Sequence, residues 1–64
     1  MQYIVSRGDD VQTFSDRSEA VSRARELSET GRVTVEWRTP TSVETLQYAE
    51  GELQSADSEN LSRR

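Results

Sequence analysis

The stretch that decides the fold is residues 16–38, DRSEAVSRARELSETGRVTVEWR. Its first part predicts a helix over residues 16–30, because small and apolar residues recur there at helical spacing. Ser15 or Asp16 can cap the start of this helix by accepting backbone N–H groups of its first turn. Gly31 is expected to end the helix in the left-handed conformation. The residues that share the apolar face are Ala20, Val21, Ala24, Leu27 and Ser28.

The second part of the stretch, residues 32–38, alternates between apolar and polar side chains. Alternation of period two is typical of a strand with one buried face. Pro40 cannot donate a ladder hydrogen bond, so the strand is expected to end before it. Val33, Val35 and Trp37 point to one side, and Thr34, Glu36 and Arg38 to the other.

The N-terminal flank predicts a hairpin. Residues 2–7 are rich in β-forming side chains and indicate a first strand,. Gly8, Asp9 and Asp10 form a turn signal, because glycine supplies a positive φ and aspartate hydrogen-bonds its own backbone. Residues 11–14 then return as a short second strand.

Residues 43–50 fit two structures. As a strand they place Leu46 and Tyr48 on one side and pair with residues 32–38 as a second hairpin. As a helix they would be capped by Thr41. Their β-branched and aromatic residues favour the strand,.

These elements predict an α+β fold of one small domain: a β-hairpin, a helix and a second β-hairpin (ββαββ), with the helix packed on an antiparallel sheet. The domain is expected to span residues 1–53. Residues 54–64 are expected to be a disordered tail, since isolated leucines bury too little to offset the entropy of ordering. The predicted core is Tyr3, Val5, Phe14, Ala20, Val21, Ala24, Leu27, Val33, Val35, Trp37, Leu46 and Tyr48.

The composition argues against catalysis. The chain has no Cys, no His and no Lys, and its eight basic residues are all Arg, against twelve acidic residues, for a net charge of −4. Thiolates, imidazoles and amines, which carry most nucleophilic and acid–base chemistry, are therefore absent. We expect no enzyme activity, no catalytic residue, no cofactor and no metal site. Arginine without lysine, with acids in excess, indicates either a GC-rich genome or a high-salt host.

The partners expected from the sequence are proteins. A chain of this length builds a small core, and without disulfides or a metal the remaining route to extra stability is a partner subunit. We therefore expect a homodimer formed through an exposed edge strand, either residues 2–7 or residues 43–50. A larger protein partner is a further expectation. No stretch is apolar enough to span a membrane, and polar residues interrupt any signal-peptide core, so a cytoplasmic location is expected.

The sequence supports three functional hypotheses. The first is an acidic, non-catalytic protein-interaction module that self-associates and serves as an adaptor, a regulator or an inhibitor. Its candidate interaction surface is Arg7, Glu36, Arg38 and Tyr48. The second is a domain that binds single-stranded nucleic acid through sheet aromatics and arginines. The net negative charge argues against it, as does the placement of Trp37 on the apolar face of its strand. The third is a small hydrolase, which requires a pair of carboxylates in a cleft.

Overall fold

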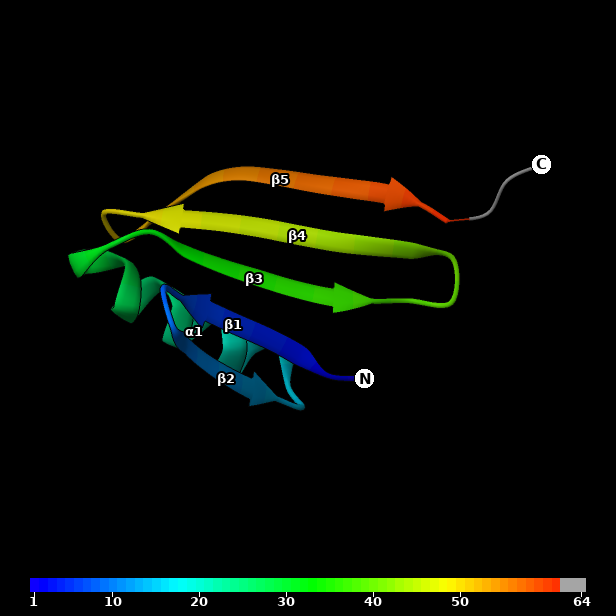
Figure 1. Ribbon diagram of the computed structural model, residues 1–64, viewed down its shortest axis with the longest axis horizontal. Coiled ribbons are helices and arrows are strands. Elements are labelled where there is room, and N and C mark those ends of the chain that lie inside the picture. The colour runs from blue at the N-terminus through cyan, green and yellow to red at the C-terminus, as the bar shows by residue number, and fades with distance from the viewer. Residues whose placement is uncertain (62–64) are drawn as a thin grey trace.

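The computed structural model describes residues 1–61 and consists of one five-stranded antiparallel sheet with one helix on one face (Figure 1). This confirms the α+β class and adds one strand to the predicted order. Along the chain the elements are β1 (Tyr3–Arg7), β2 (Asp10–Phe14), α1 (Arg17–Leu27), a 3-10 turn η1 (Ser28–Thr30), β3 (Val33–Arg38), β4 (Ser42–Ala49) and β5 (Glu52–Asn60).

The strand order across the sheet is β2-β1-β3-β4-β5, so β2 and β5 form its two edges. The prediction that residues 2–7 or 43–50 would supply a free edge is wrong. β1 lies between β2 and β3, and β4 lies between β3 and β5. The helix packs mainly across β1 and β3, and β5 lies beyond it at one side of a molecule that extends 41 × 22 × 21 Å (Figure 1).

Helix α1 begins with a side-chain N-cap and ends in a 3-10 turn. Asp16 is the N-cap, and its Oδ1 accepts the backbone N–H of Ser18 at 3.1 Å, as predicted for one of the two candidate caps. Gly31 does not take the predicted left-handed conformation, since its φ is 170°. The 3-10 turn from Ser28 to Thr30 closes the helix instead, so no left-handed residue is needed there,.

The core confirms the prediction made from side-chain spacing. All twelve predicted residues lie in it, eight of them buried and four packed against those eight. The predicted pairing of the third and fourth strands is also confirmed, with Val33 opposite Tyr48 and Val35 opposite Leu46. Ala20 and Ala24 are fully buried, and such small side chains let the helix lie close on the sheet,.

The prediction of a disordered tail from residue 54 is wrong over residues 54–60, which belong to β5. Glu50 and Gly51 both have a positive φ, 56° and 76°, and this pair makes a tight turn of the type that joins antiparallel strands,. Pairing with β4 then supplies backbone hydrogen bonds to a segment that buries little apolar surface,. All nine residues of β5 are exposed. The rest of the predicted tail, residues 62–64, lies outside the described residues.

Candidate functional site

The predicted interaction surface of Arg7, Glu36, Arg38 and Tyr48 is not one surface. Tyr48 is only 4% exposed and belongs to the core. Glu36 and Arg38 lie on the face of the sheet opposite α1, which we call the open face. Arg7 lies on the helix side, where its Nη2 donates to the carbonyl oxygen of Thr30 at 3.4 Å. The structure therefore brings Glu36 and Arg38 to one face and separates the other two from them.

The outer edge of β5 presents unpaired backbone groups. The N–H of Leu61 donates to the carbonyl oxygen of Thr41 at 2.8 Å, which places the backbone groups of Leu61 on the β4 side. Since backbone groups alternate along a strand, those of Ala56 and Ser58 point away from β4,. Within residues 1–61, β4 is the one strand that pairs with β5. Such an edge is a template for an additional strand.

Negative charge is concentrated on the β4–β5 hairpin. Residues 42–61 contain five acidic residues and no basic one, whereas residues 1–41 contain seven acidic residues and six arginines. Asp57 and Glu59 pair with Thr45 and Val43, so both carboxylates lie on the open face beside the free edge. The acidic residues of the hairpin are Glu44, Glu50, Glu52, Asp57 and Glu59.

A groove of about 450 Å³ lies on the helix side of this hairpin, where the sheet extends past α1. Arg17, the first residue of the helix, forms one wall, and its guanidinium carbon lies 5.1 Å from the centroid of the Trp37 ring. A cation at this distance from an indole ring is attracted by its π electrons. The lining residues are Arg17, Trp37, Thr39, Glu44, Leu46, Ala56, Asp57 and Ser58.

Glu44 carries a fixed charge inside this groove. Its Oε2 accepts hydrogen bonds from the hydroxyls of Ser42 at 2.7 Å and Ser58 at 2.8 Å. These two hydrogen bonds, and the positive charge of Arg17, lower the pKa of Glu44 against the opposing effect of desolvation. The Ser42 hydroxyl is itself 2.7 Å from the hydroxyl of Thr39, which holds this donor in place. Glu44 is therefore a carboxylate that stays ionised at neutral pH.

The pKa of Glu44 predicts how the stability of the protein changes with pH. Because the folded-state pKa lies below the ordinary value of 4.5, the ionised group favours the folded state above that pH, and this contribution is lost as the pH falls through the folded pKa,. We expect Glu44→Gln to have a lower thermal midpoint than the wild type near neutral pH, with the gap closing in acid. Thermal unfolding from about pH 7 to about pH 3 measures this gap.

A second variant tests the cause of that gap. Ser58→Ala removes one of the two hydroxyl donors and leaves the carboxylate in place. It should show the same trend with pH at a smaller size. A gap between Glu44→Gln and wild type that stays constant across the pH range would contradict the role given to Glu44.

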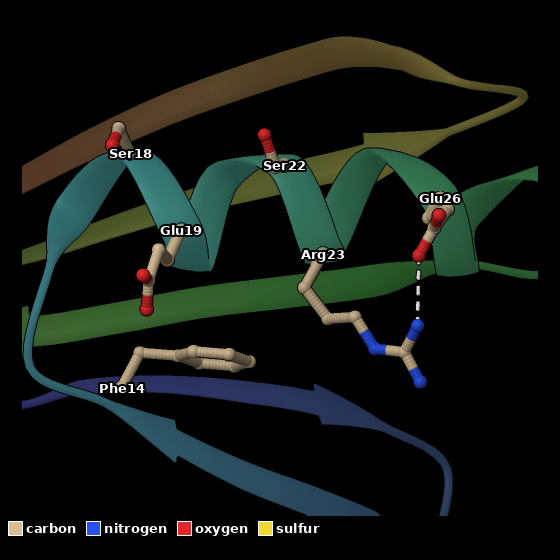
Figure 2. A pocket seen from close by; sticks show the side chains of 6 residues that line it. All are labelled: Phe14, Ser18, Glu19, Ser22, Arg23 and Glu26. Atoms are coloured by element: carbon tan, nitrogen blue, oxygen red, sulfur yellow. Dashed lines mark hydrogen bonds and ion pairs between the residues drawn. The ribbon is translucent and has the colours of Figure 1, made fainter.

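A second hollow, of about 350 Å³, lies between β2 and α1 (Figure 2). Figure 2 shows the ring of Phe14 beneath the helix and the ion pair between Arg23 and Glu26, whose Nη1 and Oε1 are 2.7 Å apart. Arg23 also donates from Nε to Gln12 at 3.4 Å. The arginine is thus already bound within the protein, whereas Glu44 in the β4–β5 groove is held by neutral hydroxyls.

The aromatic residues give a nucleic acid little to stack on. Trp37 is 9% exposed, with Arg17 over its ring and the ring of Tyr3 at a centroid distance of 5.2 Å. Tyr48 is buried in the core between the sheet and the helix layer. Base stacking requires a free aromatic face. Neither Trp37 nor Tyr48 offers one in this arrangement.

The described part of the chain shows neither a metal-binding cluster nor a membrane-spanning helix. Residues 1–61 contain no group of three or more acidic side chains placed to hold a metal ion. In the same residues, no helix has the length and apolar character needed to cross a membrane.

Comparisons with protein-family models, curated proteins and solved structures find no match. The candidate site therefore consists of the free edge of β5, the acidic hairpin and the groove. Residue type alone does not predict Ser42, Glu44 or Ser58 as members of this site. The signal was present in the spacing, because Ser42 and Glu44 continue the period-two series of Leu46 and Tyr48.

Proposed function

We propose that this chain is a non-catalytic protein-interaction module that binds its partner by strand addition at the outer edge of β5. The observation that carries the proposal is the outward direction of the backbone groups of Ala56 and Ser58 on a nine-residue exposed strand. A partner segment in extended conformation would complete these hydrogen bonds, as in other cases of β-augmentation. The cytoplasmic location expected from the sequence stays a prediction.

The β5 edge is better suited to this role than the β2 edge. β2 has five residues, whereas β5 has nine, with a register shift in its pairing beside Gln47 and Tyr48. Neither edge strand contains proline, lysine or arginine, so length is what distinguishes them. Proline and lysine are the residues that commonly protect an edge from pairing. Within β5, Ala56 and the half-exposed Leu53 lie on the groove side, where a further strand would cover them.

The groove supports binding in preference to acid–base catalysis. The lowered pKa of Glu44 makes it a poor proton donor and a weak base, because two hydroxyls already donate to it,. A carboxylate pair of the glycosidase kind needs a second group facing the same cleft. Asp57 lines the groove, but its pairing with Thr45 directs its side chain to the open face.

A second copy of the chain is the alternative occupant of the same edge, which would give the homodimer expected from the chain length. Two-fold pairing that puts Ala56 opposite Ser58 also puts Asp57 opposite Asp57. Pairing of Ser58 with itself puts Asp57 opposite Glu59, whereas pairing of Ala56 with itself puts Asp57 opposite Ser55. Like charges directly opposite one another destabilise a strand pair. Self-association through β5 is therefore expected to be limited at low salt to the register centred on Ala56, and to be stronger near 1 M salt, where the screening length falls to about 3 Å.

The variant Ala56→Pro tests the edge itself. Its ring removes an N–H that points away from β4, so the internal ladder should survive, as it does for prolines on other edge strands. We expect Ala56→Pro to abolish strand addition, measured as loss of the salt-induced dimer in sedimentation and loss of peptide binding. Ala56→Ser keeps the N–H and is the matched control. Association that is unchanged in Ala56→Pro, with the fold confirmed by circular dichroism, would overturn the proposal.

A further inference from the structure

We infer that the segment added to β5 is basic, with positively charged side chains alternating with apolar ones. This inference rests on the proposed strand addition and specifies the chemistry of the partner. It draws on the charge and the two faces of the β4–β5 hairpin.

The open face of the hairpin determines where positively charged side chains would lie on the partner strand. Residues directly opposite one another on neighbouring strands have Cβ atoms about 5 Å apart, so side chains of an added strand would lie beside Asp57 and Glu59. Residues 42–61 contain no arginine or lysine that neutralises these carboxylates. Arginine or lysine at alternate positions of the partner would supply the missing charge, whereas an acidic segment would be repelled.

The groove side of β5 determines where apolar side chains would lie on the partner strand. Alternate side chains of the added strand would lie beside Leu53 and Ala56, with Leu46 one strand further in. Leu53 is 49% exposed, so an apolar neighbour would remove apolar surface from water,. The two faces of β5 therefore require two kinds of side chain, alternating along the partner beside residues 55–59. The register shift beside Gln47 and Tyr48 interrupts this alternation between Leu53 and Ala56.

The charge distribution also ranks the other occupants. A second copy would bring the same acidic strand to the edge, and a nucleic acid would bring phosphates to it. Both meet the concentrated negative charge of the hairpin unfavourably. A basic polypeptide is the occupant that gains from both the unpaired backbone and the carboxylates.

Fluorescence anisotropy with labelled nine-residue peptides tests this inference on the full chain. One peptide alternates arginine and valine, a second glutamine and valine, and a third glutamate and valine. We expect the arginine peptide to bind most tightly and the glutamate peptide least. The double variant Asp57→Asn/Glu59→Gln should weaken the arginine peptide roughly three- to tenfold, the size expected for two cross-strand charge pairs. Asp9→Asn/Glu19→Gln removes the same charge elsewhere and should leave its affinity unchanged.

The outcomes separate the partner chemistry from the edge. Loss of arginine-peptide binding in Ala56→Pro, together with the selective effect of Asp57→Asn/Glu59→Gln, supports the inference. Equal binding of the arginine and glutamine peptides, both lost in Ala56→Pro, would overturn the inference and retain the edge. The same holds if no peptide binds but the chain dimerises and Ala56→Pro prevents it. Undiminished arginine-peptide binding by Ala56→Pro would overturn both.

Discussion

Replacing Trp37 with alanine is expected to lower the free energy of unfolding by about 3–5 kcal/mol, the largest loss expected from a single truncation in this core. Trp37 is the largest side chain of the core and is 9% exposed, and its ring packs beside that of Tyr3. Truncation of a buried Trp to Ala costs about 3–5 kcal/mol. At about 0.05–0.15 kcal/mol per residue, the whole free energy of unfolding of a chain of 64 residues is about 3–10 kcal/mol,. One truncation therefore removes much of the stability that the fold has.

Trp37→Phe is the matched control for this prediction. It keeps an aromatic ring between Tyr3 and Arg17 and removes part of the buried volume,. Its thermal midpoint should therefore lie between those of wild type and Trp37→Ala. Thermal unfolding followed by far-UV circular dichroism measures all three proteins without relying on tryptophan fluorescence. If the midpoint of Trp37→Ala stayed within a few degrees of wild type, Trp37 would not be a core residue.

The parts of the fold that were predicted from sequence are those specified by side-chain periodicity. Val33, Val35 and Trp37 alternate on one strand, and Ala20 and Ala24 recur at helical spacing, so burial selects one face of each,. These patterns identified the whole core and the helix. They depend on local spacing alone, and such spacing is visible in a single sequence.

The fifth strand was missed because its stability comes from a different source. Residues 52–60 bury almost no apolar surface, and each is exposed in the folded chain. What holds them is the backbone ladder to β4 and the tight turn at Glu50 and Gly51. A hydrogen-bond ladder leaves little trace in hydrophobic patterning. Once β5 was missed, the edge of the sheet was assigned to β4 instead.

The fold separates the residues of the candidate surface for a related reason. Residue type alone does not place Arg7 and Tyr48 on a shared surface, and period-two alternation with Leu46 puts Tyr48 on the core side. Arg7 is used within the protein, where it contacts the carbonyl of Thr30. The site that the structure indicates is instead defined by strand order and by charge segregation. Strand order depends in part on the non-local pairing of β1 with β3, which no single segment of the sequence reveals,.

Ser28 is the residue that ties the acidic hairpin to the helical layer. It is buried, its hydroxyl donates to the carbonyl of Arg25 at 2.9 Å, and it accepts the N–H of Gly51 at 2.9 Å. Its own carbonyl accepts the N–H of Glu50 at 2.8 Å. One residue at the end of α1 therefore satisfies both amides of the turn from which β5 starts.

Ser28→Ala is consequently expected to destabilise the fold by about 1–3 kcal/mol, because the amide of Gly51 loses its acceptor in a partly buried site,. Amide hydrogen exchange should accelerate first at Gly51 and along β5, before the core strands respond, since the β4–β5 turn loses its attachment to the helix. Thr30→Ala is the matched control: its hydroxyl donates to the carbonyl of Leu27 at 3.3 Å in an exposed position, within the helix end. Its effect should stay within about 0.5 kcal/mol. Equal losses in the two variants, or exchange that accelerates uniformly over the sheet, would show that Ser28 stabilises the helix end alone and does not hold the edge strand in place.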